Sequence, residues 1–118
     1  MNNNQSLRGV FCAALAVLFL LAAGQAKAVD VAVKIENFTF GPQELRVKAD
    51  TTVTWTNEDD IPHTVVSANN FRSKVLDTGG TYSFTFNKPG TYKYFCSLHP
   101  HMTGTVIVEV ETGNMAPP

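Results

Sequence analysis

The sequence of this 118-residue chain predicts an all-β fold, an antiparallel β-sandwich of about seven or eight strands. Apolar and polar residues alternate in short runs, and valine, threonine and aromatic residues dominate those runs. Turn-forming residues such as glycine, proline and asparagine separate the runs at short intervals. After residue 28, no segment keeps the apolar period of an amphipathic helix.

The first 28 residues are expected to form a secretory signal peptide. A polar start that contains Arg8 precedes an apolar run over Val10–Leu21, and mostly small residues follow over Ala22–Ala28. A membrane anchor is the alternative, but a spanning helix needs ~20 apolar residues, more than this run supplies. We therefore expect cleavage after Ala28, which leaves residues 29–118 as a single exported domain with no membrane insertion.

The first predicted strands lie in the N-terminal half of that domain. Val31–Ile35 alternates, and Phe38 and Phe40 continue the alternation until Gly41-Pro42 interrupts it. An acidic turn is expected after the strand that contains Val53 and Trp55, which should share one face. The further strands of this half are predicted at Leu45–Lys48, Thr51–Asn57 and His63–Ser67, the last one after the turn Asn57–Asp60 and Pro62.

The later strands carry most of the aromatic residues. Residues 69–80 are polar and contain glycine, so they predict a loop with a short strand near Lys74–Leu76. Thr81–Phe86 alternates strictly, which should place its three aromatic side chains on one face. A four-residue hairpin turn is expected at Asn87–Gly90. The remaining strands are predicted at Thr91–Phe95 and Thr103–Val110, before a polar tail.

Charge and cysteine content restrict the function of the exported domain. Without residues 1–28 the chain keeps seven basic and ten acidic side chains, a net charge of −3. A mildly acidic domain without a basic stripe argues against nucleic acid as a partner. Cys96 is then the sole cysteine, so it has no internal partner for a disulfide. It must be reactive, paired with another molecule, or bound to a ligand.

The neighbours of Cys96 indicate a metal centre. Cys96, His99 and Met102 follow a C-x2-H-x2-M spacing, which is short enough for their side chains to converge from one tight loop. His63 lies 33 residues upstream, where a sandwich can bring it to the same end. Two imidazoles, one thiolate and one weak axial thioether are the ligands of a blue-copper electron-transfer site. We therefore predict one copper ion that cycles between Cu(I) and Cu(II), held by these four residues.

Each of these residues also has a simpler explanation. A lone cysteine is often a small buried apolar group, a lone methionine often fills a gap in the core, and His63 could be a surface residue. Zinc is the competing metal, but thioether is not among its usual ligands and a second cysteine is missing. His101 could replace His99 as the ligand; we prefer His99 because it leaves Met102 correctly spaced.

Two stretches resemble the cupredoxins, and within them the amicyanin and plastocyanin group. PQELRVKADTTVTWTNEDDIPHTVV resembles the segment that leads to the first histidine ligand, and GTYKYFCSLHPHMTGTVIV resembles the strand, ligand loop and final strand. The two-residue gap between His99 and Met102 points to the amicyanin type. The resemblance implies a Greek-key sandwich with copper under one end, and a periplasmic protein that acts as a monomer.

The resemblance also implies residues around the ligands. Thr64, Ser97 and Pro100 should surround them, although Thr64 stands where the family usually has asparagine, and its backbone N–H could still serve the sulfur of Cys96. Electrons should pass through the ring edge of His99, inside a docking patch. That patch is expected to comprise Pro62, Leu98, His99, Pro100 and His101. Transient redox partners are implied, with a dehydrogenase as donor and a c-type cytochrome as acceptor.

Three other functions fit the sequence less well. A copper-delivery protein would favour exposed, exchangeable clusters of methionine or histidine. A copper enzyme would need a second centre, for which only His101 remains, and a Ser-His-Asp set would dismantle the metal site. A metal-free adhesion domain is permitted by the fold alone. We therefore predict an electron carrier that is not an enzyme.

Overall fold

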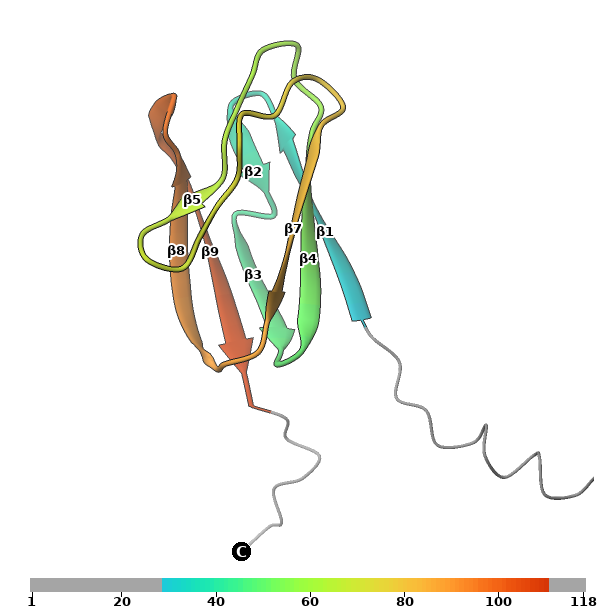
Figure 1. Ribbon diagram of the computed structural model, residues 1–118, viewed down its shortest axis with the longest axis vertical. Coiled ribbons are helices and arrows are strands. Elements are labelled where there is room, and N and C mark those ends of the chain that lie inside the picture. Colours follow the sequence, from blue (N-terminus) through green and yellow to red (C-terminus); the bar gives the residue numbers. More distant parts are fainter. Residues whose placement is uncertain (1–28, 111–118) are drawn as a thin grey trace, which may run out of the picture.

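Two β-sheets pack face to face in the computed structural model, which describes residues 29–110 (Figure 1). The expected signal peptide, residues 1–28, lies outside the described residues, as does the tail from residue 111. The first sheet has the order β2-β1-β4-β7, made of β1 (Val29–Glu36), β2 (Thr39–Gly41), β4 (Thr51–Asn57) and β7 (Thr81–Phe86). The second has the order β3-β9-β8-β5-β6, made of β3 (Glu44–Lys48), β5 (Val66–Ser67), β6 (Phe71–Arg72), β8 (Gly90–Cys96) and β9 (His99–Glu109).

The predicted all-β sandwich is confirmed, but both sheets are mixed. β1 runs parallel to β4, with Val31 opposite Val53, and β3 runs parallel to β9, with Val47 opposite Val108. The remaining pairings between strands are antiparallel. Apolar alternation reports which face of a strand is buried and carries no information about strand direction, so the sequence could not predict the two parallel pairings.

The core lies between the sheets and is rich in aromatic side chains. Trp55 is fully buried, and its ring packs against Tyr94 at 5.3 Å and Phe71 at 5.7 Å between centroids. As expected, Val53 and Trp55 share the buried face of β4. The backbone approaches the Tyr94 ring closely at Gly104, where a Cβ would collide with that ring. The other members of the core include Val33, Ile35, Phe40, Val47, Leu76, Phe86, Val106 and Val108.

The chain reverses direction at Asn37 and Phe38, where the sequence predicted continued alternation. Both residues have positive φ angles, 54° and 58°, and they form the two-residue loop of a hairpin in which Glu36 pairs with Thr39. Positive φ at both loop residues is the conformation of a type I′ turn, for which the usual sequence signal is Asn-Gly. Phe40 is buried as expected, whereas Phe38 is 52% exposed.

Two other local predictions were wrong in detail. Asn87–Gly90 does not form a hairpin turn, because β7 belongs to the first sheet and β8 to the second, so this segment crosses between the layers. The predicted strand His63–Ser67 is a strand only at Val66–Ser67. Its first residue forms an isolated antiparallel bridge with Leu76, and Val65 donates its N–H to the Ser73 side chain instead of a ladder.

The loops that follow β4 and precede β7 gather at one end of the sandwich, together with the turn between β8 and β9 (Figure 1). The described chain begins and ends at the opposite end, at Val29 and Val110 (Figure 1). Within residues 29–110, the structure contains no helix with the length and apolar character needed to span a membrane.

Candidate metal centre

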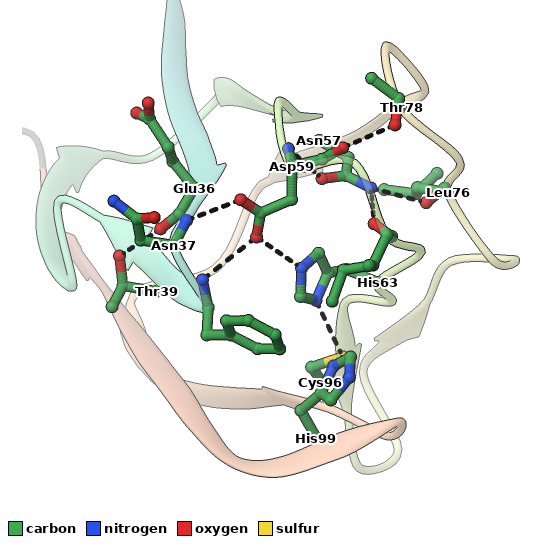
Figure 2. A network of polar contacts seen from close by, with 12 residues as sticks. Glu36, Asn37, Thr39, Asn57, Asp59, His63, Leu76, Thr78, Cys96 and His99 are labelled. Carbon is green, nitrogen blue, oxygen red and sulfur yellow. Dashed lines mark hydrogen bonds and ion pairs between the residues drawn. The ribbon is translucent and has the colours of Figure 1, made fainter.

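Three donor groups converge at the end of the sandwich that carries these loops. The Sγ of Cys96 lies 3.7 Å from Nδ1 of His63 and 3.5 Å from Nδ1 of His99 (Figure 2). The donor atoms of all three residues lie within 4.8 Å of one another. His63 and Cys96 are fully buried, and His99 is partly exposed. The arrangement is a small, largely enclosed site with one imidazole at the surface.

The hairpin between β8 and β9 positions two of these donors. Cys96 is the last residue of β8 and His99 the first of β9, and the two are paired across the turn. A register irregularity between Phe95 and Cys96 marks the point where the ladder ends. Because the turn is so short, both side chains point to the same place, as the spacing predicted.

His63 comes from the loop after β4, which two contacts hold in place. Its backbone exchanges hydrogen bonds with Leu76, at 3.1 Å for the His63 N–H and 2.8 Å for its carbonyl. The buried amide of Asn57 donates to the carbonyls of Ile61 and Leu76, both at 2.8 Å. The strand that ends at Asn57 is therefore tied to the backbone just before Pro62 and to Leu76, the bridge partner of His63.

Met102 and His101 occupy opposite faces of β9. Met102 is buried and belongs to the hydrophobic core, whereas His101 is exposed. Alternation along a strand separates neighbouring side chains in this way. The structure therefore brings His63, Cys96 and His99 together with Met102 on the inner side, and leaves His101 on the outer side.

Thr64 contacts the cysteine and the turn that follows it. Its backbone N–H donates to Cys96 Sγ at 3.3 Å, and its hydroxyl lies 3.8 Å from the same sulfur. The Thr64 hydroxyl also accepts a hydrogen bond from the Ser97 N–H at 2.8 Å and lies 2.8 Å from the Ser97 hydroxyl. A shorter side chain than asparagine thus still joins the two segments that carry the donors.

Asp59 is a member of the site that the sequence analysis missed. Its Oδ2 lies 2.8 Å from Nε2 of His63, the ring nitrogen that faces away from Cys96 (Figure 2). Partial burial raises the pKa of this carboxyl, but hydrogen bonds from the amides of Phe38 and Asn37 and the contact with His63 outweigh it, so the pKa lies below its ordinary value. A carboxylate in this position fixes the tautomer of the imidazole and leaves Nδ1 free to bind a metal.

The residues predicted for docking lie at the surface, and His99 among them is partly exposed. Leu98 is 48% exposed, and Pro62, Pro100 and His101 are exposed as well. Phe38 was not included in that prediction, yet its ring lies 5.1 Å from the His99 ring and 5.6 Å from the His63 ring, edge-on to both. Asn37 was a signal for a turn at this point, because asparagine tolerates positive φ, but it carried no information on where the Phe38 ring lies.

The donor set fits copper. One thiolate, two imidazoles through Nδ1 and a buried thioether suit an ion that is stable in both the Cu(I) and the Cu(II) state. The Cys96 sulfur is fully buried and accepts a hydrogen bond from the backbone N–H of Thr64, a contact that also suits a metal-bound sulfur. The structure describes no other cysteine, and a zinc site would more often use paired cysteines or histidines.

Comparisons with known proteins assign the family. Residues 10–108 match the cupredoxin-like domain family, and the chain belongs to it. The chain is 42% identical to amicyanin-alpha of Methylorubrum extorquens over 107 residues, which cover 82% of this chain and 87% of that protein. It is 39% identical to amicyanin of Paracoccus versutus over 95 residues, or 75% of this chain and 72% of that one.

Solved structures agree with this assignment. A variant of amicyanin in its Cu(I) form superposes with a TM-score of 0.66 at 34% identity, over 74% of this chain and 88% of that one. A purple cupredoxin from Nitrosopumilus maritimus superposes with a TM-score of 0.64 at 35% identity, over 68% of this chain and all of that one. Together with the donor geometry, these likenesses identify copper as the cofactor.

Proposed function

We propose that this protein is a diffusible blue-copper electron carrier of the periplasm, with His63, Cys96, His99 and Met102 as its copper ligands. The observation that carries the proposal is the convergence of His63 Nδ1, Cys96 Sγ and His99 Nδ1 within 4.8 Å, at a site shielded from solvent. When bound, copper supplies a one-electron change between Cu(II) and Cu(I). The protein residues hold the donors in place, stabilise the charge on sulfur and provide the path for the electron.

The protein residues perform three tasks in this proposal. Buried His63 and Cys96 hold their donors in fixed positions, so little rearrangement accompanies the change of charge. The N–H of Thr64 stabilises negative charge on the Cys96 sulfur. The partly exposed ring of His99 provides the path by which one electron enters and one leaves. Electron transfer through His99 does not require a substrate to bind to the copper. We therefore propose that the protein is not an enzyme.

Apolar groups at the docking patch support transient association with redox proteins. Leu98 and Pro100, the sequence neighbours of His99, and Pro62 are exposed apolar residues, and weak redox complexes use small interfaces of this kind of surface. The likeness to amicyanin suggests a dehydrogenase as the donor and a c-type cytochrome as the acceptor. We further propose that the carrier is exported after cleavage at Ala28, works as a monomer and makes no complex with nucleic acid.

A visible absorption spectrum tests the proposal. The copper-loaded protein should show a strong thiolate-to-copper band that bleaches with ascorbate and returns on reoxidation. Cys96→Ser should abolish the band, whereas Ser97→Ala, one residue away, should keep it. Absence of the band from wild-type protein that demonstrably contains one copper would refute the ligand assignment. Rapid loss of copper on dialysis would instead favour a delivery protein.

A further inference from the structure

A single carboxylate joins the metal centre to the hairpin between β1 and β2. Oδ1 of Asp59 accepts the Asn37 N–H at 2.7 Å, and Oδ2 accepts the Phe38 N–H at 3.1 Å while lying 2.8 Å from Nε2 of His63 (Figure 2). Asp59 itself is held by its own N–H, which donates to Asn57, and by its carbonyl, which accepts from Thr78. The backbone of Asp59 is therefore held in place independently of the contacts that its carboxylate makes with the histidine and the hairpin.

The hairpin needs this support because of its conformation. Asn37 and Phe38 both have positive φ, which is unfavourable for a bulky aromatic residue such as phenylalanine. The conformation directs both backbone N–H groups to the Asp59 carboxylate, where each finds an acceptor. Charge-assisted hydrogen bonds of this kind are stronger than neutral ones, so the carboxylate stabilises a turn that the sequence alone disfavours.

The turn places the Phe38 ring against both imidazoles. The ring stands at 87° to the rings of His63 and His99, which is the favourable edge-to-face arrangement of aromatic groups. Half of the Phe38 surface remains exposed. The same ring lines a small cavity of about 130 Å³ together with Phe40 and Met102. Phe38 thus packs against both imidazoles and shares the lining of this cavity with Met102.

We propose that Asp59 is a positioning residue of the metal centre, one that fixes the ring of His63 and at the same time holds Phe38 as an aromatic cover over His63 and His99. This inference rests on the proposed copper site. The cover keeps water away from the ligands, and the carboxylate adds negative charge behind His63. Both effects act on copper through other residues, since Asp59 faces Nε2 of His63 and the Phe38 ring packs against the imidazole rings.

Three variants test the two parts of this arrangement. Asp59→Asn keeps the shape but removes the charge and one of the two oxygen acceptors. Phe38→Ala keeps the carboxylate and removes the cover. Asp60→Asn is the matched control, because this exposed neighbour carries the same charge and takes no part in the contacts to His63 or the hairpin.

The first measurement is hydrogen exchange of the Asn37 and Phe38 amides in metal-free protein. Asp59→Asn should accelerate both by at least tenfold, whereas Asp60→Asn should leave them unchanged. The second is copper-loaded protein, in which Asp59→Asn should raise the reduction potential by more than Asp60→Asn does, because a nearby carboxylate favours the more highly charged Cu(II). Both Asp59→Asn and Phe38→Ala should release Cu(I) to a chelator at least threefold faster than wild type.

Equal exchange rates and equal potentials for Asp59→Asn and Asp60→Asn would overturn the proposal. It would also fail if the amides were exposed by Asp59→Asn while potential and copper release stayed at the Asp60→Asn values, because Asp59 would then support the hairpin alone. The exchange experiment uses metal-free protein, so its result is independent of the wild-type spectrum that tests the copper assignment.

Discussion

The hydroxyl of Thr64 accepts a hydrogen bond from the Ser97 N–H at 2.8 Å, and this contact joins the loop of His63 to the turn after Cys96. His63 and Cys96 are 33 residues apart in the sequence. The residue that follows each of them takes part in the contact, so the contact holds the two donors close together. The N–H of Thr64 makes a separate contact with the Cys96 sulfur, which does not depend on the side chain. Substitution of the side chain can therefore separate the two roles.

Thr64→Val should remove the contacts to Ser97 and preserve the N–H to the sulfur. We expect a loss of about 1 kcal/mol in the free energy of unfolding, the usual worth of a hydrogen bond. Copper affinity should fall by roughly tenfold, as is typical for residues that orient ligands. Urea unfolding and a competition assay with a copper chelator measure the two effects. Thr64→Ser, which keeps the hydroxyl, should resemble wild type; equal losses in both variants would contradict this explanation.

His99→Ala and His101→Ala should differ sharply. The His99 imidazole lies 3.5 Å from the Cys96 sulfur, whereas His101 is exposed on the opposite face of β9 from Met102. We therefore expect the thiolate-to-copper band to disappear or shift strongly in His99→Ala and to persist in His101→Ala. Spectra of both variants at equal copper content provide the measurement. Loss of the band in His101→Ala would mean that the other spacing, C-x4-H, supplies the ligand.

Copper should stabilise the folded protein. A ligand that binds only the native state adds about 2.7 kcal/mol when its free concentration is a hundred times Kd. Thermal unfolding should therefore occur at a higher temperature for copper-loaded protein than for metal-free protein, and a chelator should reverse the difference. Cys96→Ser should gain much less from copper. A wild-type protein that unfolds at the same temperature in both forms would show that the donors do not bind copper tightly.

Tyr94 should make the fold sensitive to alkaline pH. Burial raises the pKa of its hydroxyl to about 12, while an unfolded tyrosine titrates near 10. Because the folded pKa is the higher one, stability is constant below about pH 10 and falls as the pH rises from there towards 12. Between pH 8 and pH 11, wild type should lose about 1 kcal/mol more than Tyr94→Phe in urea unfolding. Parallel losses in the two proteins would exclude this origin.

Gly104→Ala should destabilise the sandwich. The added Cβ would collide with Cζ and the hydroxyl of Tyr94, whose ring is held by Phe40 at 4.7 Å and Trp55 at 5.3 Å. Overpacking of this kind costs about 1–3 kcal/mol. Urea unfolding should show that loss in the wild-type background and a smaller one when Tyr94 is also replaced by leucine. An equal cost in both backgrounds would place the strain elsewhere.

The convergence of Cys96 and His99 could be predicted from the sequence because the geometry between them is local. Cys96 and His99 are only three residues apart, so a single tight turn determines where both side chains point. The buried faces of β4 and β7 were likewise visible in the alternation of residues such as Trp55 and Phe86. In each case neighbouring residues carry all the information that the prediction needs.

Asp59 and Phe38 could not be predicted because their roles depend on contacts across the fold. Glu58, Asp59 and Asp60 form one acidic run, and only the folded loop selects the middle residue for His63. Phe38 continued an apolar alternation, and the reversal that exposes it requires acceptors that lie 21 and 22 residues away in sequence. The parallel pairings were hidden for the same reason, since they join segments that are distant along the chain.

The parallel pairing of β3 with β9 has a consequence for the order of folding. β9 is the last strand of the described chain, carries His99 and Met102, and fills a central place in its sheet between β3 and β8. Pairings between distant segments close late, because the entropy of a long loop must be lost first. The proposed copper centre therefore cannot assemble until almost the whole domain is available to fold. Copper should therefore bind only to chains that have completed folding. A chain truncated before β9 lacks His99 and Met102 and cannot form the site.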